Sequence, residues 1–303
     1  MKFPSRSTLM LLAAMAAWGS LYPVSKLLMS DLHPLTLSFL RYAFGMIPLV
    51  PFYIKQKNHG MKPVERKDNF RLLVLGILGI TLFALFLFFG LRLSSGANGS
   101  LLANTQPVFA ALAAPLLIRE RITPSQVLGI LLGLLGILLV TARGNPFELE
   151  GYMNNGTLLL LLAALSMTVY SVFLQALVRK YGSLSATLGT MLWGTLFLLA
   201  ILTLFPGGLS DFRHLDTLRE FLLIFYLGAA ATAFPYLMFN KALETTGVVT
   251  ATGYKFLIPV SGVTLSVLIL REIPSFLNII GIAIVLFSVI YLQKKERIVD
   301  FKP

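Results

Sequence analysis

The 303-residue sequence contains no cysteine, only three histidines and only 13 acidic residues. The absence of cysteine excludes disulfide frameworks, thiol nucleophiles, and cysteine-ligated zinc or iron–sulfur sites. Three histidines are too few for the usual multi-histidine metal centres. The sequence therefore predicts no metal site and no cofactor.

Apolar segments, in contrast, dominate the chain. Hydrophobic residues make up 56% of the sequence, charged residues make up 13%, and the mean hydropathy is +0.81. This composition is typical of an integral membrane protein. The net charge of +12 does not indicate a nucleic-acid-binding surface, because the basic residues lie between hydrophobic runs.

The apolar runs predict ten transmembrane helices, each close to the roughly 20 residues that cross a bilayer core. They cover residues 7–29, 34–54, 72–92, 95–117, 124–142, 156–178, 183–205, 221–241, 246–270 and 274–293. The N-terminal run has features of a secretory signal, but it continues past Trp18 to Met29. We therefore expect an uncleaved first helix and an all-α integral membrane fold.

The basic residues predict the orientation of the chain, since basic loops stay in the cytoplasm. With a cytoplasmic N-terminus, sixteen of the 25 Lys and Arg residues lie in cytoplasmic loops and tails, against five in outer loops. We therefore expect a multi-pass protein of the cell (cytoplasmic or inner) membrane with both termini in the cytoplasm. Its basic loops would face anionic lipid head groups.

An internal repeat relates the two halves of the chain. A shift of 152 positions superimposes Pro107-Val108 on Pro259-Val260, Arg119-Glu120 on Arg271-Glu272, and Gly129-Ile130 on Gly281-Ile282. We interpret the matches as a duplicated five-helix unit, with residues 1–148 as the first copy and 149–303 as the second. Because five spans are an odd number, the second copy must insert upside down, which is typical of secondary transporters.

Several short motifs occur in a characteristic order along the chain. They are Trp18-Gly19 with Lys26, Pro34 with Arg41, Gly90-Leu91-Arg92 with Ser94-Ser95, Pro107 running to Arg119-Glu120, Ala242-Leu243 with Thr246-Gly247, and Tyr254 to Val260 running to Glu272. In this order and spacing the chain resembles EamA-type transporters of the drug/metabolite transporter superfamily. It departs from them at Arg119 and Arg271, where glycine is frequent, and by lacking a tryptophan near Ser166-Met167.

The resemblance implies ten helices in two inverted halves around a central cavity. It implies that the cavity is lined mainly by helices 1, 3, 4, 6, 8 and 9 and that small metabolites cross by alternating access, often outward. A bacterial cytoplasmic membrane is the setting that the resemblance favours.

Two prolines indicate where a substrate could bind. Pro107 and Pro259 each fall near the middle of a predicted span, where a proline removes a backbone hydrogen bond. Helices broken at matching depths in two halves are typical of transporter binding sites. Asn104 shares a helix face with Pro107, and Lys255 shares one with Pro259. Packing between helices is the competing role for the prolines and the amide.

Lys255 is the most informative single residue. It lies too deep in its span to reach the head groups easily, so its charge requires an anion or carbonyl oxygens nearby. No Asp or Glu lies in the middle of a predicted span. Its partner could therefore be freed backbone oxygens, water or the anionic group of a substrate.

Other residues receive simpler assignments. The aromatic candidates for the cavity wall are Trp18, Tyr22, Tyr170 and Tyr254. We assign Arg41 to helix packing. The small residues Gly129, Gly133 and Gly136 have the spacing of close helix contacts, which would serve packing or a homodimer.

The leading functional hypothesis is a secondary transporter that exports a small metabolite, such as an amino acid or an organic acid. Mid-span charge that is purely cationic favours substrates bearing a carboxylate. The alternative is a multidrug carrier that expels amphiphilic cations. A membrane enzyme lacks the paired acids, histidine cluster or nucleophile motif that it would need, and a channel lacks a filter sequence, so no catalytic residue is predicted.

Overall fold

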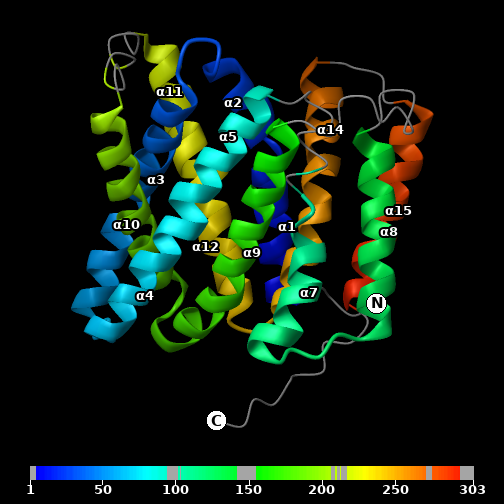
Figure 1. The fold of residues 1–303 in the computed structure, drawn as a ribbon, viewed down its shortest axis with the longest axis horizontal. Coiled ribbons are helices and arrows are strands. Elements are labelled where there is room, and N and C mark those ends of the chain that lie inside the picture. The colour runs from blue at the N-terminus through cyan, green and yellow to red at the C-terminus, as the bar shows by residue number, and fades with distance from the viewer. Residues whose placement is uncertain are drawn as a thin grey trace.

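The computed structural model describes residues 5–93, 102, 104–141, 155–205, 209, 212, 217–270 and 275–293. These residues form a bundle of helices, and no strand occurs among them (Figure 1). The first half contains α1 (Arg6–Gly19), α2 (Leu21–Leu28), α3 (Pro34–Asn58), α4 (Arg66–Gly76), the π-helix η1 (Ile77–Leu82), α5 (Phe83–Leu93), α7 (Gln106–Ile118) and α8 (Pro124–Thr141). The second half contains α9 (Asn155–Tyr181), α10 (Ser183–Leu204), α11 (Leu218–Gly228), the π-helix η3 (Ala229–Ala233), α12 (Phe234–Leu243), α13 (Val248–Gly253), the 3₁₀ turn η4 (Tyr254–Phe256), α14 (Leu257–Leu270) and α15 (Phe276–Gln293).

Seven helical stretches of the described residues are long and apolar enough to cross a membrane. They are Arg6–Ser25, Pro34–Asn58, Arg66–Leu93, Asn155–Tyr181, Ser183–Leu204, Leu218–Leu243 and Val248–Leu265, and three shorter apolar helices accompany them at Gln106–Ile118, Pro124–Val140 and Phe276–Leu292. Large hydrophobic side chains such as Leu116, Leu131 and Phe276 are exposed on the outside of the bundle. An apolar exterior of this kind fits lipid contact, so the chain is a multi-pass membrane protein.

The N-terminal helix is interrupted, whereas the sequence predicted one continuous helix over residues 7–29. α1 and α2 are separated at Ser20, whose hydroxyl donates to the carbonyl oxygen of Ala17 at 2.7 Å and accepts from the Tyr226 hydroxyl at 2.8 Å. These two hydrogen bonds satisfy the Ser20 hydroxyl inside the bundle, and a hydropathy average gives no sign of them. The interruption lies between two of the aromatic residues predicted for the site.

Helical elements recur along the chain at the offset of 152 residues. α4 begins at Arg66 and α11 at Leu218, η1 begins at Ile77 and η3 at Ala229, and α8 and α15 cover Pro124–Thr141 and Phe276–Gln293. π-helical turns are rare and often occur at functional sites. Their matching positions show that the repetition extends from the sequence to the local backbone.

Both prolines lie where the helical geometry changes. Pro107 is the second residue of α7, where its missing amide removes no helical hydrogen bond, so it starts a helix instead of kinking one. Pro259 lies inside the helical stretch Val248–Leu265, three residues after the 3₁₀ turn η4, so this helix is irregular where the sequence predicted a break. α7 and α14 occupy opposite halves of the bundle (Figure 1).

The glycine stripe of α8 packs against other elements of the same chain. A Cβ atom on Gly136 would lie 2.9 Å from the backbone nitrogen of Val285 and 3.0 Å from the carbonyl oxygen of Gly281 on α15. Gly129 lies against Leu292 of α15, and Gly133 lies against the ring of Phe256. The stripe therefore serves close helix packing within the chain, which was one of its two predicted roles.

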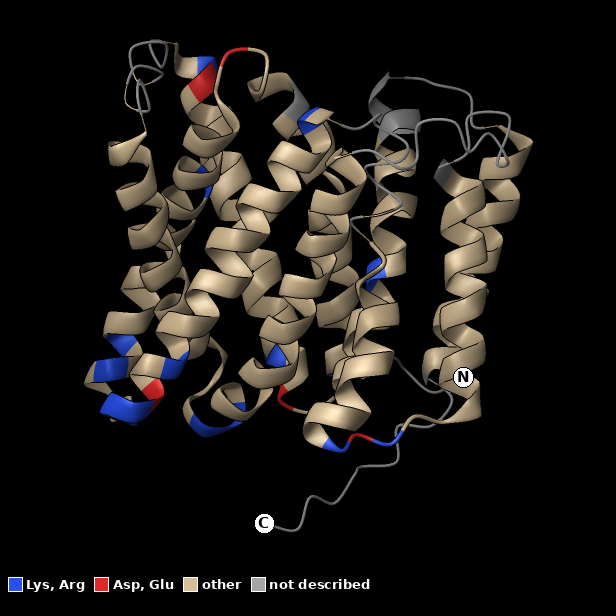
Figure 2. Cartoon of the chain, viewed as in Figure 1, with Lys and Arg blue, Asp and Glu red and all other residues tan. Residues whose placement is uncertain are grey.

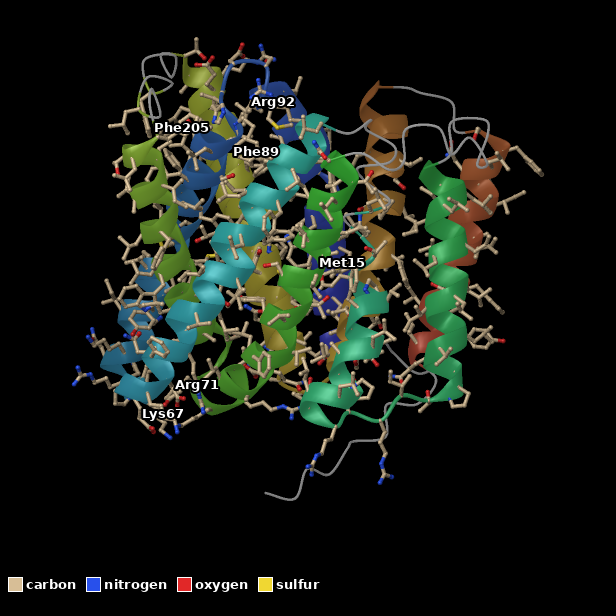
Figure 3. All side chains as sticks on the ribbon, in the orientation of Figure 1. Met15, Lys67, Arg71, Phe89, Arg92 and Phe205 are labelled. Carbon is tan, nitrogen blue, oxygen red and sulfur yellow. The ribbon has the colours of Figure 1, made fainter. Side chains whose placement is uncertain are left out.

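Most of the Lys and Arg residues coloured in Figure 2 lie at one end of the bundle. Lys67 and Arg71 lie at this end, which we call the basic end, and Arg92 lies at the opposite end (Figure 3). The carboxylate of Asp68 joins α4 to α9 there, through Lys180 at 2.7 Å and the Tyr181 hydroxyl at 2.7 Å. These contacts tie the two halves of the chain together at the basic end.

Candidate functional site

A cavity lies inside the bundle, with about 450 Å³ of space not filled by atoms, part of it open to solvent. Helices from both halves of the chain contribute to its wall. The wall consists of Trp18, Leu21, Tyr22, Arg41, Phe83, Leu87, Asn104, Gln106, Met167, Tyr236, Lys255 and Ile258. Four of the predicted site residues lie in this wall, namely Trp18, Tyr22, Asn104 and Lys255.

Lys255 enters the wall from the 3₁₀ turn η4 and is 6% exposed. Its ammonium group donates to the side-chain oxygen of Gln106. It also lies 4.7 Å from the ring centre of Trp18 and 4.8 Å from that of Phe239. Cation–π contacts stabilise a desolvated cation but do not neutralise it. These contacts of Lys255 therefore bring no negative charge to the cavity wall.

Gln106 holds Lys255 in place, and the sequence analysis did not single it out. Its amide nitrogen donates to the carbonyl oxygen of Met167 and to the hydroxyl of Ser171, each at 3.1 Å, which leaves the amide oxygen for Lys255. The sequence did contain a signal for Gln106, which is that it directly precedes Pro107 in the middle of a predicted span. A proline there can mark the start of a helix, and the residue before it then lies at the break between two helical segments. Gln106 thus links α7 and α9 to η4.

Arg41 is the second cation of the wall, although the sequence analysis assigned it to helix packing. It is 1% exposed, and its Nη2 donates to the Tyr42 hydroxyl at 3.2 Å. Its guanidinium carbon lies 4.7 Å from the ring centre of Tyr42 and 5.5 Å from that of Phe88. Its Nε and Nη1 have no hydrogen-bond partner among the described residues. Donors of this kind are costly to bury unless a ligand or water takes them up.

A short chain of hydrogen bonds fixes the orientation of Arg41. The Tyr42 hydroxyl, which accepts from Arg41, lies 3.1 Å from the Tyr236 hydroxyl, which donates to the carbonyl oxygen of Gly79 at 3.1 Å. Since Tyr236 donates to Gly79, Tyr42 donates to Tyr236. Gly79 lies in the π-helix η1, where the wider turn changes the helical hydrogen bonding. The π-turn therefore has a role in supporting the site.

Aromatic and amide groups complete the wall. The Trp18 ring meets the Tyr236 ring edge-on with 5.6 Å between centres, and the Asn104 amide lies 3.4 Å from the Tyr22 hydroxyl. The cavity thus combines aromatic surfaces with a few polar groups, which is the usual character of small-molecule sites.

The other four predicted residues are not in the cavity wall. Tyr170 is buried, with its hydroxyl 3.3 Å from that of Thr190 and its ring against Gly79, so it packs α9 against its neighbours. Tyr254 is also buried, and its hydroxyl points toward Thr8. Pro107 and Pro259 lie in the first turns of α7 and α14, each next in sequence to a residue of the cavity wall, Gln106 and Ile258. Aromatic residues cannot be sorted into wall and packing positions by residue type alone.

On the basic side of the cavity, Glu120 caps the start of α13. Its carboxylate accepts from the backbone amides of Val248 at 2.9 Å and Val249 at 3.2 Å. Burial raises the pKa of Glu120 above its ordinary value, while the two amides act in the opposite direction. This buried cap joins the end of α7 to the second half of the chain.

Replacing Glu120 with glutamine is expected to destabilise the protein by about 1 kcal/mol, the usual cost of losing a helix cap. The single side-chain oxygen of glutamine is uncharged, so it accepts fewer and weaker hydrogen bonds from the two backbone amides than the carboxylate does. The thermal midpoint of the purified variant checks the expectation. Glu65→Gln is the control, because Glu65 is exposed and its ion pair with Lys180 is at the surface. Equal midpoints for the two variants would contradict the capping role.

Replacing Gln106 with glutamate tests whether Lys255 is available to a ligand. The new carboxylate would pair with Lys255 inside the cavity and is expected to weaken binding of an anionic ligand at least about tenfold. Gln106→Leu removes the contact without adding charge and is the matched control. The affinity of each variant for an anionic ligand, measured by thermal stabilisation, distinguishes the effect of the added charge in Gln106→Glu from the loss of the contact in Gln106→Leu. Unchanged affinity for an anion in Gln106→Glu would show that Lys255 does not contact the ligand.

The part of the chain that the structure describes contains no group of three or more His, Asp or Glu side chains able to hold a metal ion. The polar groups of the wall are instead two cations, two amides and the hydroxyls of two tyrosines. These groups can bind and orient a small molecule.

Comparisons with known proteins give a consistent result. The sequence model of the EamA-like transporter family matches residues 5–142 and again residues 154–293. Among relatives, the uncharacterized transporter YdfC of Bacillus subtilis is 29% identical over 264 residues, covering 87% of this chain and 83% of its own length. An uncharacterized transporter of Archaeoglobus fulgidus is 26% identical over 295 residues, covering 97% of this chain and 99% of its own.

A solved structure shares the fold. A protein crystal structure superimposes with a TM-score of 0.78 and covers 95% of this chain and 96% of its own, at 20% sequence identity. At that identity the likeness concerns the fold alone. It supports the arrangement of helices that surrounds the cavity.

Proposed function

Because the chain belongs to the EamA-like transporter family of the drug/metabolite transporter superfamily, we propose that it is a secondary carrier that moves small carboxylate-bearing metabolites through this cavity. The family is one of transporters rather than enzymes. The observation that carries the proposal is a cavity with two buried cations, Arg41 and Lys255, in its wall. Organic acids and amino acids are the candidate substrates.

The charge of the wall supports this choice of substrate. Two nitrogens of Arg41 have no hydrogen-bond partner in the described part of the chain, and the hydrogen-bond partner of Lys255 there is an uncharged amide. A cation inside a membrane protein is stabilised by a nearby anion. An amphiphilic cation would gain from the aromatic rings but would meet two like charges, so multidrug efflux is disfavoured.

The proposed mechanism is alternating access between two inverted five-helix units, residues 1–148 and 149–303. The 152-residue offset between helical elements supports the duplication. α7 and α14 start beside the cavity residues Gln106 and Ile258 and occupy opposite halves of the bundle, as inverted copies would (Figure 1). Interrupted helices at matching positions are typical of carriers that rock around a central site.

The proposed orientation places the basic end in the cytoplasm, with both termini on that side of the cell membrane. The gathering of Lys and Arg at this end supports it through the positive-inside rule. The caps and ion pairs at the basic end, including those of Glu120 and Asp68, close this side of the bundle. α2 and α5 supply cavity residues from the half away from the basic end, which fits an outward-facing conformation. Export of the substrate stays a prediction from the family resemblance.

Transport by the purified protein in liposomes tests the proposal. Vesicles loaded with an unlabelled organic acid or amino acid are expected to accumulate the same labelled compound by exchange, and protein-free vesicles are not. The same exchange assay is carried out in parallel with lipophilic cations. Exchange of cations but of no carboxylate would replace this proposal with the multidrug alternative.

A further inference from the structure

The two cavity cations differ from the other Lys and Arg residues whose side chains the structure describes. Arg41 and Lys255 are the Lys and Arg side chains that are buried among the described residues, and both line the same cavity. Neither makes an ion pair within the described part of the chain, where the salt bridges all involve Asp68, Glu65 or Glu244. Residues 94–103, which lie mostly outside that part, contain no Asp or Glu.

Two charges in one buried cavity are costly when no acidic side chain among the described residues pairs with them. Each loses hydration on burial, and the two repel each other in surroundings of low polarity. The tyrosine chain and the aromatic rings orient them but supply no negative charge. A ligand with two negative charges would neutralise both at once.

The wall also selects against an ammonium group on the ligand. The cavity-lining residues include no carboxylate that could pair with it. The Trp18 face is already occupied by the Lys255 ammonium group, and the Tyr42 face by the Arg41 guanidinium. A zwitterion could satisfy one cation, but its ammonium group would lie near the other without a counter-charge.

We propose that the cavity binds an organic dianion with two separated carboxylate groups, one at Arg41 and the other at Lys255, with the connecting carbons against Trp18 and Tyr236. This inference rests on the proposed function and narrows it from carboxylate-bearing metabolites to dicarboxylates. Arg41 makes more of the contacts with the ligand, because its Nε and Nη1 are donors that find no partner among the described side chains and backbone. Gln106 acts as a positioning residue for Lys255.

A series of four-carbon probes that differ only in their end groups tests the proposal. The probes are succinate with two carboxylates, butyrate with one, 4-aminobutyrate as a zwitterion and 1,4-diaminobutane as a dication. Their affinities for the detergent-purified full chain follow from thermal stabilisation, since a ligand of the folded state raises its apparent stability by mass action. Dicarboxylates of three, five and six carbons, each paired with its monocarboxylate, cover other spacings between the two cations.

The expected result is that one dicarboxylate binds at least about tenfold more tightly than its monocarboxylate, because the second buried charge pair adds affinity. Arg41→Gln and Lys255→Gln are each expected to bring that ratio to within about twofold, since each leaves one cation for one carboxylate. Lys241→Gln, which removes a partly exposed lysine paired with Glu244, is the control that keeps the ratio. The wild-type ratio is decisive by itself if a variant does not fold.

Other results separate the failure of this inference from that of the proposed function. Equal affinity for both members of every pair would overturn the dianion while leaving a carboxylate carrier intact. Tightest binding of a phosphate monoester, run as a further probe, would place both charges at one end of the ligand and also overturn it. Tightest binding of 4-aminobutyrate would overturn the dianion and would favour amino acids over organic acids as the substrates of the proposed carrier. Binding of the diamine alone, or of no probe, would overturn both.

Discussion

Replacing Lys255 with methionine is expected to reduce carboxylate transport about 100-fold or more. Methionine has a similar length but no charge, so the variant loses the ligand contact and leaves the Gln106 oxygen without its donor. Removing one partner of a buried charge pair typically costs about 2–5 kcal/mol, and about 2.7 kcal/mol corresponds to 100-fold. Initial rates of exchange in liposomes, corrected for the amount of folded protein, provide the measurement.

Lys241→Met is the matched control for this experiment. Lys241 is partly exposed and pairs with Glu244 three residues further along the chain. A surface pair of this kind contributes little to stability, so transport is expected to change less than about twofold. Full transport by Lys255→Met would remove Lys255 from the site and would contradict the proposal that the cavity binds an anion there.

Replacing Gly136 with leucine is expected to destabilise the protein by about 3 kcal/mol or more, the upper end of the usual cost of overpacking. The atoms that the new side chain would meet include the backbone nitrogen of Val285 and the carbonyl oxygen of Gly281. Backbone atoms cannot move aside as a flexible side chain can, so α8 and α15 would have to separate. The thermal midpoint in detergent measures the loss.

Ala200→Leu is the control for that prediction, because Ala200 is exposed on α10 and the added atoms face the surroundings of the bundle. Its thermal midpoint is expected to match that of the wild type. If Gly136→Leu were equally stable, the close packing of α8 on α15 would not hold in the membrane protein. In that case the glycine stripe would be available for contact with a second copy of the chain.

Much of the fold could be predicted from the sequence because each signal is local. Every predicted apolar range overlaps a described helix, since hydropathy and length depend only on neighbouring residues. Residues 95–101 and 103 of the predicted range 95–117 lie outside the described residues. The 152-residue repeat was also visible in aligned pairs such as Pro107 and Pro259, and helical elements such as η1 and η3 follow it. The break at Ser20 was missed, because it depends on a contact with Tyr226 from a distant helix.

The candidate site was predicted in part. Lys255, Trp18, Tyr22 and Asn104 were found because charge, amide and aromatic groups are conspicuous in apolar spans, and all four line the cavity. Tyr170 was selected by the same reasoning but packs between helices. Residue type indicates that a side chain must face the interior, but not which interior surface it meets.

The sequence by itself determined that this is a multi-pass membrane protein of repeated design, because hydropathy, basic loops and the repeat are properties of the chain read in order. Only the tertiary structure decided that Arg41 faces the cavity with two nitrogens unpartnered among the described residues, and that Gln106 accepts a hydrogen bond from Lys255. Gln106 and Lys255 are 149 residues apart, and they meet because two interrupted helices start beside each other. Electrostatic complementarity depends on such distances between side chains, and these exist only once the bundle has formed.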